Sequence, residues 1–248
     1  LVLQAGLRFP YLPFLGLHVE ARFSPRVGND GRSRALLFRN NRQHMISFRS
    51  ALRLLCAETE RLMRVPAIVD MNDYEVALSF EDIARFLIVI LVPHGPSALR
   101  LTDLYAAAVP LAVPDEPLIH KHMWSSRTFG GFDADPLWRS VAPAEARGGR
   151  QAGIAAGAKP YSLLDFLGAG SLRSTLGAQH YWLQYTEWLL LPHVIRFDSL
   201  PRLLELLAAL TVEDAQQVSA RMGRHHAEVV SCTLGWWQAA VAALCASR

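Results

Sequence analysis

Lysine is almost missing from this sequence: Lys121 and Lys159 are the only lysines among 25 basic residues. The arginines that supply the rest are scattered along the chain, and the formal net charge is only +3. Nucleic-acid-binding domains present clustered basic side chains to phosphates. The composition therefore predicts no nucleic-acid partner.

Cysteine is also scarce, and no metal-binding spacing is present. Cys56, Cys232 and Cys245 lie far apart without a C-x-x-C pair, which argues against a disulfide framework and a structural zinc site. We predict that all three are buried thiols, the usual state of free cysteine. The two histidine pairs of the sequence lack a third ligand at a suitable spacing, so no metal site is predicted.

Long apolar runs and the best-known catalytic loops are missing as well. The best apolar run, 86–93, is strand-sized, and no segment reaches the ~20 uninterrupted apolar residues of a membrane helix, so no membrane-spanning helix is predicted. No Walker loop, no G-x-G-x-x-G after a strand and no G-x-S-x-G elbow occurs, which leaves P-loop, dinucleotide and hydrolase functions without their defining motif. The chain begins at Leu1 rather than Met, so we expect a fragment or processed form with an N-terminal domain upstream. An upstream anchor would indicate the Golgi or the secretory pathway.

What the sequence does contain is a regular alternation of short apolar strands and helical patterns. Hydrophobic residues make up 51% of the 248 positions, enough for a packed core. The alternation predicts an α/β fold, a doubly wound open parallel sheet of about five strands with helices on both faces. The predicted strands are 35–38, 66–69, 87–92, 109–113 and 193–197. The predicted helices are 45–64, 80–86, 98–107, 176–190, 200–210 and 212–245.

Two segments fall outside this alternation. Residues 1–34 are rich in Pro, Gly and Arg and are predicted to be a leading segment or interdomain linker before the domain at 35–248. Residues 115–174 carry repeated glycines and are predicted to be a long irregular insertion. The aromatic stripe of helix 176–190 is predicted to pack on the sheet, and Trp236 and Trp237 to seat the last helix.

One stretch carries a family resemblance. Asp103, Ala106, Ala108 and Pro110 precede the short strand Leu111-Ala112-Val113. This resembles the acidic-x-x-Ala-x-Gly-x-Pro run, followed by a strand, in the donor-binding half of two-domain GT-B type glycosyltransferases. The resemblance implies a Rossmann-like domain that binds a nucleotide-diphosphate sugar, with the carboxylate of Asp103 on the ribose hydroxyls.

The same resemblance implies further donor-binding residues. His94, Gly95 and Ser97 follow the strand before the motif, where small residues and N–H groups would receive the diphosphate. Arg39 and Arg42, after the first strand, are the nearest candidates for the basic pair that contacts the diphosphate. The acidic residues after the strand 109–113, Asp115 and Glu116, would bind sugar hydroxyls. No metal and no cofactor beyond the donor substrate is implied.

The favoured hypothesis is therefore transfer of a sugar from a nucleotide-diphosphate donor to a glycan, protein or lipid acceptor. The acceptor-activating base would come from the upstream N-terminal domain, so no catalytic residue is assigned in this chain. Ala108 replaces the family's glycine, and Gly95 stands where many members have a second carboxylate. These departures favour the alternative, a non-catalytic degenerate α/β interaction module. A flavodoxin-like domain that binds flavin is a third hypothesis.

Overall fold

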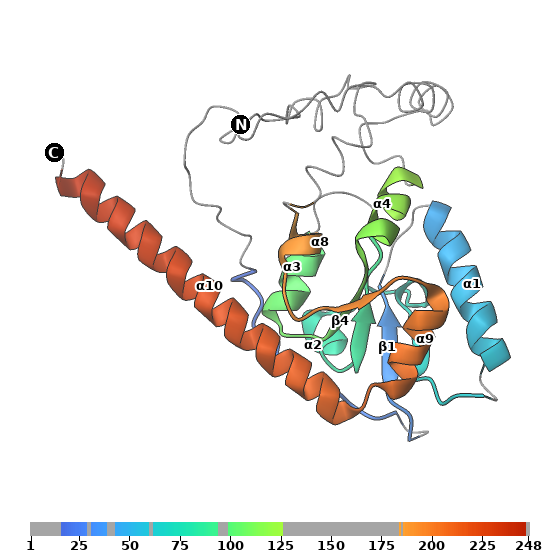
Figure 1. The fold of residues 1–248 in the computed structure, drawn as a ribbon. Coiled ribbons are helices and arrows are strands. Elements are labelled where there is room, and N and C mark those ends of the chain that lie inside the picture. The colour runs from blue at the N-terminus through green and yellow to red at the C-terminus, as the bar shows by residue number, and fades with distance from the viewer. Residues whose placement is uncertain are drawn as a thin grey trace, which may run out of the picture.

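Five parallel strands form one sheet in the computed structural model, in the order β2-β1-β3-β4-β5 (Figure 1). The strands are β1 (Arg34–Leu37), β2 (Ala67–Asp70), β3 (Ile88–Ile90), β4 (Leu111–Pro114) and β5 (Ile195–Phe197). The structure describes residues 16–28, 31–38, 43–59, 62–93, 99–125, 184 and 186–246. The α/β class and the parallel sheet of five strands are confirmed.

Helices cover both faces of this sheet, as the continuous apolar strands require. They are α1 (Gln43–Thr59), α2 (Phe80–Ile83), α3 (Leu99–Ala106), α4 (Glu116–Ser125), α8 (Glu187–Leu190), α9 (Leu200–Ala209) and α10 (Val212–Ala246), with the 3-10 turn η1 (Met71–Asp73) after β2. One apolar cluster joins α1 and α9 to the sheet. A second cluster on the other face includes residues of α2, α3, α8 and the first part of α10.

The strand order creates a switch point between β1 and β3. β1 pairs with β2 on one side and with β3 on the other. The helix that follows β1 packs in one apolar cluster, and the helix that follows β3 packs in the other. Connections that leave adjacent strands toward opposite faces open a crevice at the carboxyl ends of those strands, where ligands of open α/β sheets bind.

Residues 16–28, here called the N-terminal strap, run across α2 and α3 before the chain enters the sheet. Val19 and Ala21 are buried in the second apolar cluster. Backbone N–H groups of the strap donate to carbonyls at the ends of both helices, from Phe23 to Ala107 at 3.2 Å and from Ser24 to Ala84 at 2.9 Å. Part of the predicted linker is therefore packed on the domain.

Gly16 sets the close approach of the strap to α3. Its φ is +53°, and a Cβ built on it would lie 2.9 Å from the Cβ of Ala106. Gly31 has a similar φ of +71°, but a Cβ there would meet nothing within 4 Å. The two glycines therefore share a left-handed backbone and differ in the space around them.

We expect Gly16→Ala to lower the free energy of unfolding by about 2–4 kcal/mol, through left-handed strain and overpacking. Gly31→Ala, which carries the strain alone, should cost about 1 kcal/mol. Urea unfolding of both variants measures the difference. Equal losses would show that the strap does not approach α3 closely.

The first part of α10 docks on α3. Ala215 and Met222 are fully buried there. The Tyr105 hydroxyl of α3 donates to the Pro192 carbonyl at 3.1 Å and lies 3.1 Å from Nδ1 of His225 in α10. Because a hydroxyl has one proton, its oxygen is left to accept a hydrogen bond from the His225 Nδ1–H. The docking therefore places a proton on Nδ1 of His225.

Burial lowers the pKa of His225, the nearby His193 and His226 lower it further, and Glu228 opposes them. The neutral form is thus preferred in the folded state, with a pKa below the value of about 6.5 in unfolded chains. The lowered pKa of His225 therefore makes the folded state more stable at high pH than at low pH. This stability is fully present above pH of about 6.5 and is lost as the pH falls through the folded-state pKa.

We therefore expect the free energy of unfolding of the wild type to fall between pH of about 7 and about 5 more steeply than that of His225→Gln. Glutamine keeps a donor for the Tyr105 oxygen but does not titrate. Chemical denaturation across this pH range measures the two slopes. Identical slopes would mean that His225 is not held neutral by its surroundings.

Two predicted elements need correction. The predicted insertion starts later than residue 115, because Glu116–Ser125 form α4, which Pro117 in the first turn suits; residues 126–174 lie outside the described residues. The predicted helix 176–190 is wrong at its end, because Thr186 has extended backbone (φ −93°, ψ 157°) and the helix begins only at Glu187. The rest of that prediction, with Tyr181, Trp182 and Tyr185, lies outside the described residues.

The predictions for the last helix were right in extent and wrong in packing. α10 has 35 residues and is about 52 Å long, whereas α3, on which it docks, has 8 residues. Its second half therefore extends past α3 (Figure 1). Trp236 and Trp237 are exposed rather than seated on the sheet. Cys232 and Cys245 are exposed and Cys56 is half-buried, so the prediction of three buried thiols was wrong.

The described residues include one helix, α10, that is long and apolar enough to cross a membrane by length and composition. An 18-residue window of it has a mean hydropathy of 1.5, and 6% of that window is buried in the fold. The criterion of uninterrupted apolar residues missed this segment because Ser231, Thr233 and Gln238 interrupt it.

Candidate functional site

The candidate site is the carboxyl edge of the sheet around the β1/β3 switch point. Of the predicted site residues, Asp103, Asp115 and Glu116 lie in described parts of the chain. Arg39, Arg42, His94, Gly95 and Ser97 lie outside them. β1 ends at Leu37 and α1 begins at Gln43; β3 ends at Ile90 and α3 begins at Leu99.

Asp103 lies on α3 and faces the N-terminal strap. Its side chain is only 11% exposed. The Oδ1 atom lies 3.4 Å from Nε2 of His18 in the strap, and the Oδ2 atom lies 3.9 Å from Arg100 on the same helix. Arg100 also lies over the ring of Phe80, 5.4 Å from its centroid, and His18 meets this ring edge-on. The carboxylate thus already has the His18 imidazole and the Arg100 guanidinium as neighbours within the chain.

Ala108 has a left-handed backbone. Its φ is 54°, and it occupies the position where the family motif has glycine. It links α3 to β4: its N–H donates to the Tyr105 carbonyl, and the next N–H donates to the Leu104 carbonyl. This is the hydrogen bonding of a helix C-terminus closed by a left-handed residue, a position that glycine normally fills. This position of the motif therefore has the left-handed conformation that favours glycine, although the residue here is alanine.

Asp115 and Glu116 follow β4 at the carboxyl edge. The Asp115 Oδ1 accepts a hydrogen bond from the Leu118 N–H at 3.1 Å and so caps α4, while its N–H donates to the Phe197 carbonyl at 2.8 Å. Burial lowers the pKa of Arg196 in β5, and Asp115 and Glu116 oppose this shift. The Arg196 guanidinium donates to the Trp188 carbonyl at 2.7 Å. Asp115 therefore already holds α4 in place, and Arg196 holds α8 in place.

A second charged group at this edge was not predicted. Asp70, 3% exposed, ends β2, and its Oδ2 accepts from Nε of Arg49 on α1. Arg53, one helical turn further on, bridges Asp70 at 3.4 Å and Asp73 at 2.9 Å. The sequence contains a signal for this network. Arg49 and Arg53 are four residues apart and share one face of a helix, and Asp70 directly follows the predicted strand 66–69. The network ties α1 to the carboxyl end of β2.

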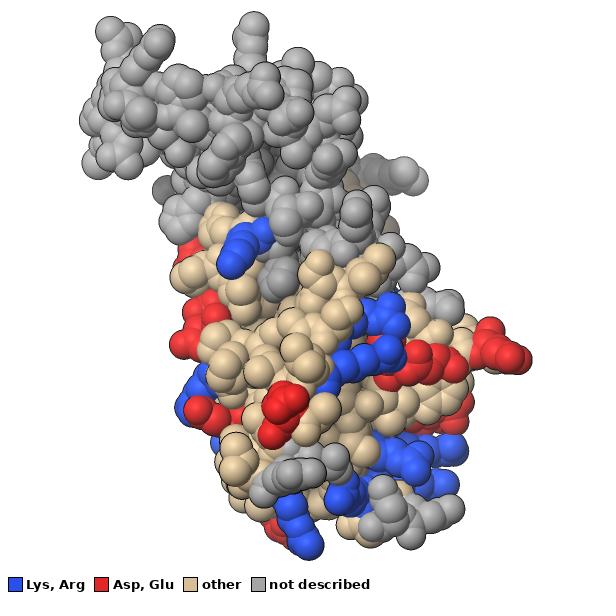
Figure 2. Space-filling model, turned by 90° about the vertical axis from the view of Figure 1, so that its right-hand side faces the viewer, with Lys and Arg blue, Asp and Glu red and all other residues tan. Residues whose placement is uncertain are grey.

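Charges on the face that carries α1 are interspersed rather than separated by sign (Figure 2). This agrees with the scattered arginines of the sequence, and the described residues form no extended basic surface on this face.

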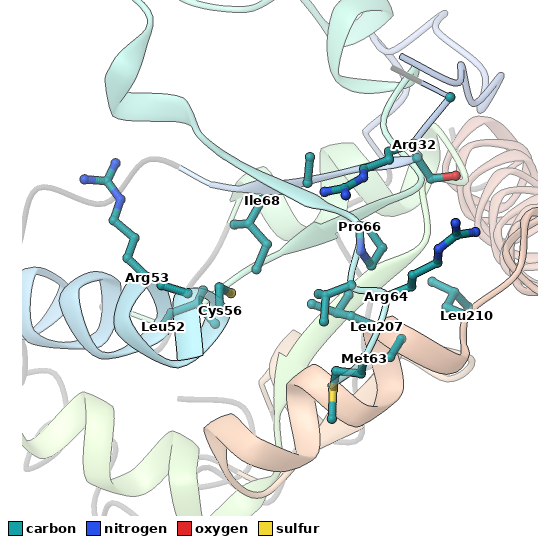
Figure 3. Close-up of a pocket in the computed structure, with 16 residues that line it drawn as sticks. Arg32, Leu52, Arg53, Cys56, Met63, Arg64, Pro66, Ile68, Leu207 and Leu210 are labelled. Carbon is teal, nitrogen blue, oxygen red and sulfur yellow. The ribbon is translucent and has the colours of Figure 1, made fainter. Parts of the chain in front are cut away.

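A pocket of about 700 Å³ lies at the opposite, amino edge of the sheet (Figure 3). Residues of α1, the segment before β2 and the end of α9 line it, among them Cys56, Arg64 and Leu207. Burial raises the pKa of the Cys56 thiol, which keeps it protonated and a poor nucleophile. None of the predicted site residues lines this pocket. It therefore belongs to a different part of the molecule from the candidate site.

The strain at Ala108 can be measured against its neighbour. Ala107 is equally an alanine buried beside α3, but its φ is not positive. We expect Ala107→Gly to cost about 1.5 kcal/mol through lost burial and added unfolded-state freedom. Ala108→Gly should change the free energy of unfolding by less than about 0.5 kcal/mol, because relief of left-handed strain offsets those losses. Equal costs in thermal unfolding would argue against a left-handed Ala108.

No protein-family description, no curated protein and no solved structure matches this chain. The functional assignment therefore depends on the residues of this chain and their geometry.

Proposed function

We propose that this chain is the donor-binding domain of a nucleotide-sugar-dependent glycosyltransferase. The observation that carries the proposal is the conformation of residues 103–110: a helix with an acid, a left-handed turn at the glycine position, and then a buried strand. The strand order supports it, because β2-β1-β3-β4-β5 has the neighbours of the dinucleotide-type sheet without its outermost strand.

In this proposal the donor lies across the β1/β3 switch point. Asp103 accepts hydrogen bonds from the ribose hydroxyls, and Asp115 and Glu116 contact the sugar. Arg39 and Arg42, with the N–H groups around Gly95 and Ser97 and the His94 side chain, stabilise the negative charge on the departing diphosphate. Stabilisation of that charge is the main electrostatic requirement of glycosyl transfer. The base that deprotonates the acceptor comes from another domain.

A second candidate function is favoured by the surroundings of Asp103. The strap covers this residue, and His18 and Arg100 lie beside its carboxylate. A ribose would have to displace His18, whereas a non-catalytic interaction module would keep this contact as part of its fold. The two candidates therefore differ in whether Asp103 exchanges a partner in its own chain for a ligand.

We expect UDP or GDP to raise the melting temperature of the purified chain. At about 100 times the dissociation constant, binding stabilises the fold by about 2.7 kcal/mol. For a domain of this size, this is a shift of roughly 5–10 °C. Asp103→Asn should abolish the shift because it removes the charge that strengthens both hydrogen bonds. Differential scanning fluorimetry, with each variant's melting temperature first recorded without nucleotide, measures this.

Glu205→Gln is the matched control, since it removes an exposed carboxylate from α9, on the other face of the sheet. It should leave the nucleotide shift unchanged. If no nucleotide shifts the wild type, the interaction module is the better function. If the shift persists in Asp103→Asn, the ribose contact is wrongly assigned. Flavin absorbance of the same preparation would point instead to the flavodoxin-like hypothesis, which shares this strand order.

A further inference from the structure

The pocket at the amino edge of the sheet is lined by both apolar and basic side chains (Figure 3). Its volume of about 700 Å³ is within the range of about 300–1,000 Å³ that is typical of sites for small organic molecules. None of the predicted donor-site residues lines it. A ligand bound in this pocket would therefore be independent of the proposed donor site.

Apolar side chains make up one part of the lining. Leu52 of α1 and Leu207 of α9 are each 1% exposed and belong to the apolar cluster that joins these helices to the sheet. Cys56, Met63 and Ile68 pack against this cluster but are only half-buried. Ile68 lies in β2, at one end of the strand order, whereas the central β3 and β4 are covered on both faces. The pocket therefore leaves apolar surface next to the core that a ligand can cover.

The charged part of the lining is basic. Three arginines line the pocket, Arg32, Arg53 and Arg64, and none of the described residues that line it is acidic. The charge of Arg53 is already balanced, because its guanidinium pairs with Asp70 and Asp73. The charge complementarity of this pocket therefore favours an anion.

Arg64 is the cation that is available to such an anion. The residue is exposed, and it forms no ion pair with the acidic residues in the described part of the chain. In the view of Figure 3, the side chains of Arg32 and Arg64 lie above those of Met63 and Leu207. Positive charge and apolar surface therefore lie side by side in one pocket.

The helix ends at the pocket do not cancel this charge. α1 and α9 both end here, and the last carbonyls of a helix carry about half a negative charge. At the end of α1, the Thr59 hydroxyl donates to the Leu55 carbonyl at 2.7 Å. The N–H groups of Leu62 and Met63 donate to the Thr59 carbonyl at 2.8 and 3.0 Å. Because these carbonyls already have donors, the full charge of Arg64 outweighs what remains.

We propose that the amino-edge pocket binds an anionic amphiphile, a molecule with a single carboxylate on an apolar chain. The planar guanidinium of Arg64 receives the carboxylate, because its fork of N–H donors matches the two carboxylate oxygens. The chain covers the half-buried side chains of Cys56, Met63 and Ile68. A small polar anion would leave this apolar surface in water, and an uncharged apolar molecule would leave Arg64 without a partner. A ligand that combines charge and chain uses both parts of the lining.

Isothermal titration calorimetry of the full chain with decanoate tests the proposal. We expect saturable binding of one decanoate per chain, and much weaker binding of acetate, which lacks the chain, and of decylamine, which reverses the charge. Arg64→Gln should weaken decanoate binding by about 10-fold or more, because it removes a charged hydrogen-bond donor. Arg202→Gln is the matched control, since it removes the same charge from an exposed arginine of α9 that does not line the pocket. It should leave binding unchanged.

Ala57→Trp tests where the decanoate lies. Ala57 is exposed and lines the pocket, so a tryptophan should be tolerated by the fold and should occupy the space of the chain. We expect it to abolish decanoate binding, with the circular dichroism spectrum of each variant compared with that of the wild type. The proposal is overturned by no binding or unsaturable binding of decanoate, by equal binding of decylamine, by equal weakening in both arginine variants, or by unchanged binding in Ala57→Trp.

Discussion

Burial of β3 and β4 on both faces is the constraint on which the rest of this fold depends. Their residues from Ile88 to Ile90 and from Leu111 to Val113 are between 0% and 1% exposed. Strands this short contribute few ladder hydrogen bonds, so the sheet is stable only when apolar side chains cover it from two sides. One side is closed by α1 and α9. The other needs α2, α3, the strap and the first half of α10, which come from both ends of the described chain.

This constraint also explains how much of the fold the sequence could predict. Strands 87–92 and 109–113 were recognised because a strand covered on two faces is continuously apolar, a pattern that needs no knowledge of its neighbours. The packing of Val19 and Ala21 on α3 had no such local signal, because it joins segments more than 80 residues apart. The contact between His18 and Asp103 was missed for the same reason. The overhang of α10 was missed because it depends on the length of α3, the helix it docks on.

The motif around Ala108 illustrates why a resemblance predicts fold more readily than function. A left-handed residue between α3 and β4 is needed to end the helix and start the strand, whether or not a nucleotide binds nearby. That conformation therefore does not separate a working donor site from a non-catalytic module with the same turn. Asp103 is the residue that distinguishes these two cases. Its buried carboxylate lies beside His18 and Arg100 and must give up at least one of these neighbours to bind a ribose.

The two halves of α10 differ in their charged residues and in how much of each half is buried. Where the helix lies along α3, small and medium apolar residues such as Ala215 and Met222 face the domain, and charged residues such as Arg221 and Arg224 face water. From residue 229 to 246 the helix has no charged residue, and Thr233 is buried while most of its neighbours are exposed. Along one helix the chain therefore changes from a charged half with a side buried against α3 to an uncharged half that is mostly exposed among the described residues.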